Sequence, residues 1–309
     1  MRPGGKNTRD YRDVDGILIL DKASGLSSNQ ALQRVRKLYA ARKAGHCGSL
    51  DPLATGVLPI CLGEATKFSS YLLGANKTYR ADCRLGQVTT TGDAEGDIID
   101  TAPVDVDLER IERELERFLG VIEQVPPMYS ALKHQGKRLY QLAREGKQVD
   151  RPPRRVEIFD LRLLALEGDI MRIEVSCSTG TYIRSLAEDI GKRLGCGAHI
   201  TALRRTSVDV FDEEDALSFE CLQDLQQLRG MAAIDARLLP VTVALQRFPE
   251  IVLDSVDSIA IRQGRRLQPE PGMEPGLYRL SSSLDGFIGL GEVTENNELQ
   301  AKRLMNTAR

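Results

Sequence analysis

Residues 45–59 read GHCGSLDPLATGVLP, the densest cluster of chemically distinctive side chains in the chain. Its three glycines let the backbone turn sharply and approach a ligand closely. Asp51 lies between Leu50 and Leu53, so we expect its carboxylate to be partly desolvated. Taken locally, Asp51 followed by Pro52 is typical of a helix start, with the aspartate as N-cap. The loop by itself leaves both interpretations open, a reactive carboxylate and a helix cap.

Short strands and amphipathic helices are expected on both sides of this loop, from apolar runs, alternation and helical periodicity. The expected strands are 14–20, 77–85, 156–166, 170–177 and 200–210, and the expected helices are 27–41, 64–73, 107–119 and 181–194. Ser27 and Gln30 form a capping box. The helix over 107–119 is expected to bury Leu108, Ile111, Leu115 and Phe118. Because no strict βαβ rhythm is present, the sequence predicts an α+β fold with a mixed, largely antiparallel central sheet flanked by helices.

The residue composition and the hydrophobic pattern of the sequence change near Phe248. Beyond it, short apolar runs alternate with Pro, Gly and Ser clusters, a pattern typical of a small all-β unit. We therefore expect a larger domain over 1–247 and a small all-β domain over 248–309.

Composition excludes several classes of protein. The 309 residues suggest about two domains, and 41% apolar with 28% charged residues fits a globular chain. No apolar run reaches the 18 or so residues of a membrane helix, and the polar N-terminus lacks a secretory signal. Six scattered cysteines and three histidines form no metal-ligand pattern, so we expect no metal site, free thiols and a cytoplasmic location.

The charges are unevenly distributed, although the net charge is only −2. Residues 130–155 hold eight basic side chains against Glu145 and Asp150, and residues 31–50 hold five basic side chains and no acid. Such segments are typical of surfaces that bind a phosphate backbone, but also of ordinary solvated faces. The two segments together leave these interpretations about equally supported.

Three further side chains, outside this loop, are candidates for a functional site. Tyr79 lies on the apolar face of a predicted strand and is more typical of the core than of a site. Asp93 lies in a predicted turn. Arg184 is in the first turn of a predicted helix, where its charge opposes the helix dipole, so we expect a specific anionic partner such as a buried carboxylate.

Six ordered motifs resemble the TruB family of tRNA pseudouridine synthases, over nearly the whole chain. The segment 45–59 resembles the family's signature loop, and the others are DKASGLSS (21–28), KTYR (77–80), the stretch from YSALK (129–133) to Gly146, CSTGTYIRS (177–185), and the stretch from GAH (197–199) to Arg205. The resemblance identifies Asp51 as the family's essential aspartate, against the local helix-cap interpretation. It also implies the pseudouridine synthase fold with a PUA-like RNA-binding domain at the C-terminus.

The resemblance further implies the roles of individual residues. Asp51, Tyr79 and Arg184 would be catalytic; Arg184 would pair with Asp51 and lower its pKa. His46, Tyr182 and Leu203 would bind the substrate, and the basic insertion at about 127–155 would grip RNA through residues that include Lys133, Lys137 and Arg138. Cys47 stands where the family usually has Thr.

The implied reaction isomerises uridine to pseudouridine at position 55, in the T loop of tRNA, after base flipping. The implied partner is the T arm of tRNA, with no metal, cofactor, membrane, guide RNA or protein partner, and we expect a monomer. The alternative is a non-catalytic tRNA-binding or tRNA-folding protein of the same fold. A pure binder has no need of a paired carboxylate, so the presence of Asp51, Tyr79 and Arg184 favours the enzyme.

Overall fold

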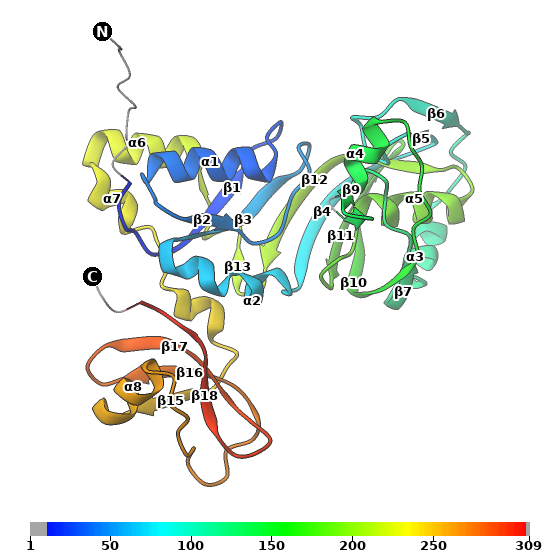
Figure 1. Ribbon diagram of the computed structural model, residues 1–309. Coiled ribbons are helices and arrows are strands. Elements are labelled where there is room, and N and C mark those ends of the chain that lie inside the picture. The colour runs from blue at the N-terminus through cyan, green and yellow to red at the C-terminus, as the bar shows by residue number, and fades with distance from the viewer. Residues whose placement is uncertain (1–10, 131, 307–309) are drawn as a thin grey trace.

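The computed structural model describes residues 11–130 and 132–306 (Figure 1). Most of the polar N-terminal segment, Ala131 of the YSALK motif and the last three residues of the expected C-terminal domain lie outside these ranges.

The described residues form a ten-stranded sheet at the centre of the molecule. Its main strands, in spatial order, are β14 (Leu217–Ser218), β1 (Gly16–Lys22), β3 (Thr55–Leu62), β12 (Ala198–Val208), β4 (Lys77–Leu85), β11 (Ile170–Cys177), β10 (Arg154–Glu167) and β7 (Gly120–Gln124). Two short strands lie off this path: β2 (Ala44–His46) pairs with β3, and β13 (Phe211–Asp212) pairs with β12. Strand β4 has the bounds that its alternating sequence predicted.

The sheet is mixed but largely antiparallel, as predicted. Only β1 with β14 and β3 with β12 run parallel among the described pairs. The contact of β3 with β12 is short, with Thr55 opposite Arg204 and Gly56 opposite Arg205. Gly56 has φ +98°, and a Cβ at this position would lie 2.2 Å from the main-chain oxygen of Arg205. Glycine is therefore required where β3 meets β12, the place at which the two halves of the sheet join.

Helices cover the two ends of the sheet (Figure 1). Helices α1 (Ser28–Leu38), α6 (Phe219–Arg229) and α7 (Met231–Asp235) lie at the β1 end, and α3 (Leu108–Glu116) and α5 (Ile183–Leu194) at the β10 end. The predicted capping box is confirmed: the Ser27 hydroxyl accepts from the main-chain N–H of Gln30, whose side-chain oxygen accepts from the N–H of Ser27.

Two helix predictions need correction. Leu108 was expected in the core but is 53% exposed, because it lies at the first position of α3, whose buried residues are Ile111 and Leu115. The helix expected over 64–73 is a 3₁₀ segment, η1 (Gly63–Phe68), followed by α2 (Ser69–Leu73).

Three small elements lie above the β10 end of the sheet in Figure 1. One is a hairpin of β5 (Gln87–Thr89) and β6 (Ile98–Thr101). The others belong to the basic insertion: a hairpin of β8 (Lys133–His134) and β9 (Lys137–Arg138), and helix α4 (Leu139–Arg144).

The C-terminal unit has a sheet of its own, which follows η2 (Val241–Leu245). Its strands are β15 (Glu250–Leu253), β16 (Gly276–Ser282), β17 (Gly286–Val293) and β18 (Leu299–Leu304). The expectation of a purely β unit is wrong in one respect: α8 (Ser255–Arg262) begins after Asp254, whose carboxylate caps it. This unit packs on η1 and α2, where Phe287 lies 5.8 Å from Phe68 between ring centroids.

Candidate active site

The loop between β2 and β3 carries Asp51 to the place where the two halves of the sheet meet. Hydrogen bonds from outside fix this loop. Among them, the N–H of Leu50 donates to the Ser28 hydroxyl (2.7 Å), and the N–H of Gly25 donates to the Pro52 carbonyl (2.8 Å). No helix follows Pro52, because β3 begins at Thr55. The helix-cap interpretation of Asp51 is therefore wrong, and its carboxylate is free to face the site.

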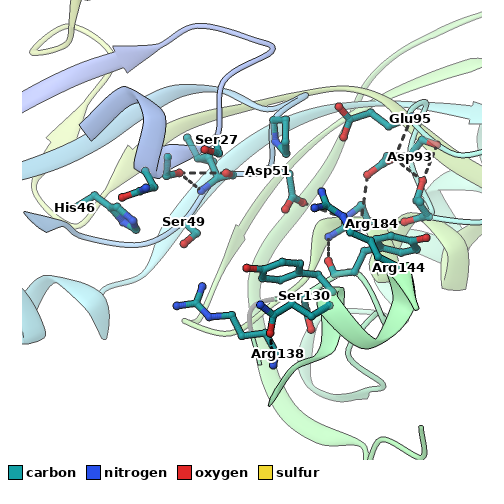
Figure 2. A pocket seen from close by; sticks show the side chains of 18 residues that line it. Ser27, His46, Ser49, Asp51, Asp93, Glu95, Ser130, Arg138, Arg144 and Arg184 are labelled. Atoms are coloured by element: carbon teal, nitrogen blue, oxygen red, sulfur yellow. Dashed lines mark hydrogen bonds and ion pairs between the residues drawn. The ribbon is translucent and has the colours of Figure 1, made fainter. Parts of the chain in front are cut away.

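Asp51 and Arg184 form an ion pair (Figure 2). Nε of Arg184, in the first turn of α5, lies 3.0 Å from Oδ2 of Asp51, and the guanidinium is almost completely buried. Main-chain oxygens hold the same guanidinium, since Nη1 donates to Thr91 (3.0 Å) and Nη2 to Tyr129 (2.7 Å). Asp93 adds a second carboxylate, 3.5 Å from Nη1. The anionic partner expected for Arg184 is thus present.

The pKa of Asp51 shifts in the direction opposite to our expectation. Enclosure by the walls of the site raises this pKa, and the nearby Asp93 carboxylate raises it further. Arg184 and, more weakly, Lys22 lower it, but they do not cancel the rise. Asp51 is therefore an aspartate that ionises at a higher pH than usual, beside an arginine that limits the rise.

A small cavity of about 320 Å³ lies on one side of Asp51. Tyr79 from β4, Leu203 from β12 and Tyr182, the residue before α5, all line it. Tyr79 and Leu203 are each 8% exposed and belong to the main hydrophobic core, so the expected core position of Tyr79 is confirmed while its side chain also lines the cavity. Arg154 lies over the Tyr182 ring, 4.8 Å from its centroid.

A larger cavity of about 820 Å³ lies on the other side. His46, Asp93, Arg138 and Arg144 line it, among other residues. The two cavities share five lining residues: Ser49, Leu50, Asp51, Ser130 and Arg184. Asp51 therefore lies at the junction of a small and a large cavity.

Burial lowers the pKa of His46, and Arg205 lowers it further, so its imidazole is neutral near pH 7.

The three basic residues predicted to bind RNA do not lie together at the site. Arg138 lines the larger cavity, whereas Lys133 and Lys137 are exposed on the hairpin and line neither cavity. Nζ of Lys137 lies 3.9 Å from the Glu145 carboxylate.

Two site residues, Lys77 and Arg205, escaped the sequence analysis. Both line the small cavity. A usable signal existed, because Lys77 falls on the same face of its alternating strand as Tyr79, and Arg205 on the same face of its strand as Leu203. A basic residue on an inward face of a strand is a candidate for a buried charge.

Among the residues with described positions, no group of three or more His, Cys, Asp or Glu side chains could hold a metal ion. No helix within residues 11–130 and 132–306 is long and apolar enough to cross a membrane.

Three family models match consecutive parts of the chain. The TruB family pseudouridylate synthase N-terminal domain matches residues 36–183, the tRNA pseudouridylate synthase B C-terminal domain matches 184–246, and the C-terminal model of pseudouridine synthase II TruB matches 249–305.

Curated relatives extend over almost the full length. A tRNA pseudouridine synthase B of Chromohalobacter salexigens is 53% identical, with 96% of this chain and 95% of that protein covered. One of Methylobacillus flagellatus is 51% identical, with 97% and 98% covered. A solved H/ACA ribonucleoprotein bound to a substrate RNA containing 2′-deoxyuridine contains a similar chain, with a TM-score of 0.73, 25% identity, and 94% of this chain and 85% of that chain covered. The chain therefore belongs to the TruB family of pseudouridylate synthases, as its motifs predicted.

Proposed function

We propose that this protein isomerises uridine to pseudouridine at position 55, in the T loop of tRNA. Its family and the two relatives named tRNA pseudouridine synthase B support this activity and this class of substrate. The position within tRNA comes from the motif resemblance.

The observation that carries the proposal is the location of Asp51. Its carboxylate lies 3.0 Å from Arg184, at the junction of a cavity of about 320 Å³ and one of about 820 Å³. The smaller cavity suits a single flipped base and the larger one suits the neighbouring loop. The anomeric carbon of the target nucleotide would then lie beside Asp51.

The reaction needs Asp51 as a carboxylate. Attack on the anomeric carbon uses its electron pair, and support of elimination uses its charge or basicity. The N1–C1′ bond breaks, the uracil turns in the small cavity, and a C5–C1′ bond forms as the proton on C5 is lost. Substrate and product are isomers, so no oxidant or reductant is consumed.

The other site residues would hold the flipped nucleotide. Tyr79 would stack on the base, Tyr182 and Leu203 would line its pocket, and His46, in the larger cavity, would fill the place that the base leaves in the T loop. Flipping costs a few kcal/mol, which stacking and filling of this kind offset.

Regions outside the cavities would bind the rest of the T arm and tRNA. The exposed Lys133 and Lys137, with Arg138 at the cavity wall, would contact phosphates from the basic insertion. We propose residues 1–247 as the catalytic domain and 248–309 as a PUA-like RNA-binding domain. Because the chain carries its own basic insertion, it would bind tRNA without a guide RNA. We also propose that it acts in the cytoplasm as a monomer.

The test uses a T-arm stem-loop RNA with tritium at C5 of the target uridine. Formation of the C5–C1′ bond releases this tritium to water. We expect release by the wild type, none by Asp51→Asn, and tRNA affinity within a few-fold of wild type for that variant. Asp169→Asn, in the exposed turn between β10 and β11, is the control and should keep full activity.

Absence of release by the wild type, with tight tRNA binding intact, would favour the alternative, a non-catalytic tRNA-binding or tRNA-folding protein. Release by Asp51→Asn at the wild-type rate would remove Asp51 from the mechanism.

A further inference from the structure

Two buried cations line the small cavity without a carboxylate partner. Arg205 is 0% exposed and Lys77 is 7% exposed. They lie close together, because a side-chain carbon placed on Gly48 would be 3.5 Å from both Nη1 of Arg205 and Cε of Lys77. Neither forms a salt bridge with an acidic residue in the part of the chain that the structure describes. A buried cation without an anion is strongly destabilising, so this arrangement needs an explanation.

Main-chain hydrogen bonds explain how the two side chains are held, but not why they are charged. Arg205 donates through Nε to the Val57 oxygen (2.7 Å) and through Nη2 to the Gly48 oxygen (3.3 Å). Lys77 donates to the oxygens of Ala75 (2.5 Å) and Leu73 (3.4 Å). Nη1 of Arg205 is buried and has no hydrogen-bond partner among the described residues. One donor of a rigidly held guanidinium therefore remains available.

The cavity has two further cations, which differ from these two. Arg154 is only partly buried, lies over the Tyr182 ring and donates to the Gly180 oxygen. Arg184 is already matched by Asp51 and Asp93. Arg205, by contrast, acts on the basic groups around it: it lowers the pKa of Lys77 and that of His46. It also lies beside Tyr79 and opposes the rise that burial causes in the pKa of that phenol. The surroundings of Arg205 and Lys77 thus have an excess of positive charge and favour an anionic ligand.

The reaction of the proposed function creates an anion in this cavity. When the N1–C1′ bond breaks with its electron pair on N1, the uracil carries a negative charge that is delocalised over O2 and O4. Fixed donors in a site shielded from water stabilise such a charge far better than water-exposed donors do.

We propose that Arg205, assisted by Lys77, stabilises the departing uracil: the free N–H at Nη1 of Arg205 donates to a carbonyl oxygen of the base as the N1–C1′ bond breaks. This role rests on the proposed function. The electron pair of the broken bond stays on the base until C5 bonds to C1′, so the step needs no co-reactant. Asp51 acts on the sugar, and the buried cations act on the base.

The test compares two leaving groups in the same T-arm stem-loop RNA. One RNA carries uridine at the target position, and the other carries 5-fluorouridine, whose fluorine withdraws electrons and stabilises the departing anion by itself. Single-turnover cleavage of the N-glycosidic bond is followed by nuclease digestion and chromatography of the N-linked nucleoside. RNA affinity is measured in parallel.

We expect Lys77→Met to slow cleavage of the uridine RNA about 10-fold and Arg205→Met about 100-fold, the range found when a preorganised donor is removed. The same variants should slow cleavage of the 5-fluorouridine RNA by no more than about 3-fold, because that leaving group depends less on the cations. Arg205→Lys should regain part of the rate. Lys192→Met, an exposed lysine of α5, is the control and should change neither rate.

Arg205 also donates hydrogen bonds to the Gly48 and Val57 carbonyls, so the folding of each variant is checked by thermal unfolding. If Arg205→Met fails to fold, Lys77→Met and Arg205→Lys provide the same comparison of the two RNAs. Equal losses with both RNAs would overturn the proposal, because misplacement of Asp51 slows both. Weaker RNA binding at an unchanged cleavage rate would also overturn it and would indicate a phosphate site. A wild type that cleaves neither RNA would refute the proposed function itself, whereas active wild type with unaffected variants refutes only the role of Arg205 and Lys77.

Discussion

Nη2 of Arg184 donates a 2.7 Å hydrogen bond to the main-chain oxygen of Tyr129. Tyr129 begins the YSALK motif of the basic insertion, and Arg184 is the residue whose Nε pairs with Asp51. One guanidinium thus joins the carboxylate to the segment that we propose to grip RNA. The position of the insertion and the charge of the site are physically connected through this side chain.

Removing the charge of Arg184 should move the acid limb of the pH–rate profile upward. In the proposed reaction Asp51 must be ionised to act, its pKa is already raised by burial, and Arg184 opposes that rise. In Arg184→Gln this opposing effect is lost and the pKa of Asp51 rises further, so the loss of activity on acidification should begin at a higher pH than in the wild type. The rate near pH 7.5 should also fall about 100-fold or more. Single-turnover tritium release between pH 5 and 8.5 measures both effects. Arg193→Gln, on the same helix and paired with Glu114, should leave the acid limb in place; an unmoved limb in Arg184→Gln would show that Asp51 does not control it.

A side chain at Gly56 should disrupt the junction of the sheet. Gly56 has φ +98°, and an added Cβ would lie 2.2 Å from the main-chain oxygen of Arg205. Backbone strain and this overlap should lower the free energy of unfolding of Gly56→Ala by more than about 2 kcal/mol. Urea unfolding measures it. Gly45→Ala, in the neighbouring strand β2, is the matched control, since no heavy atom from outside its immediate chain neighbours lies within 4 Å of its Cβ position. Similar stability of the two variants would contradict this account.

The burial of Lys77 should make stability depend on pH. Burial lowers the pKa of Lys77 from 10.5 to about 8, and the neighbouring Arg205 lowers it too. Between pH 8 and 10.5 the unfolded chain therefore holds more protons at this site than the folded chain, and stability rises with pH in that window. The cost of the buried charge is fully present below pH 8.

We accordingly expect the unfolding free energy of the wild type to rise relative to that of Lys77→Met by up to about 3 kcal/mol between pH 7.5 and 10.5. Urea unfolding of both proteins at four pH values in this range measures the difference. Lys192→Met should show a constant difference from the wild type. A constant difference for Lys77→Met as well would mean that the folded protein does not depress the pKa of Lys77.

Neutralising the insertion should weaken RNA binding and its dependence on salt. Lys133, Lys137 and Arg138 are exposed in the β8–β9 hairpin, beside the larger cavity that Arg138 lines. If each contacts a phosphate, replacing all three by Gln should lower the slope of log K against log salt by about 0.7–0.9 per lost contact. Filter binding of tRNA between 50 and 300 mM salt measures the slope. The matched control is the triple variant Arg113→Gln, Arg117→Gln and Lys192→Gln. It removes three exposed charges, from α3, from the C-terminal cap of α3 and from α5, and should keep the wild-type slope. An unchanged slope in the hairpin variant would exclude phosphate contacts by the hairpin.

The sequence predicted those features that depend on residues a few positions apart. The Ser27–Gln30 capping box and the bounds of β4 follow from side-chain spacing along a single element, and the structure confirms both. The ordered motifs identified the family, and the dipole argument predicted an anionic partner for Arg184. Each of these depends on local geometry or on a pattern carried by the chain itself.

The tertiary structure decided what depends on segments far apart in the chain. Asp51 is not a helix cap, because β3 follows it and β12 pairs with β3 directly beyond the loop. The pKa of Asp51 is raised rather than lowered, because enclosure by distant segments, together with the Asp93 carboxylate, outweighs the favourable charges of Arg184 and Lys22. Lys77 and Arg205 become neighbours only when β4 and β12 pair and bring them to one cavity. The sequence determines which side chains are available to the site, and packing determines their burial and charge environment, because desolvation depends on every segment that surrounds a group.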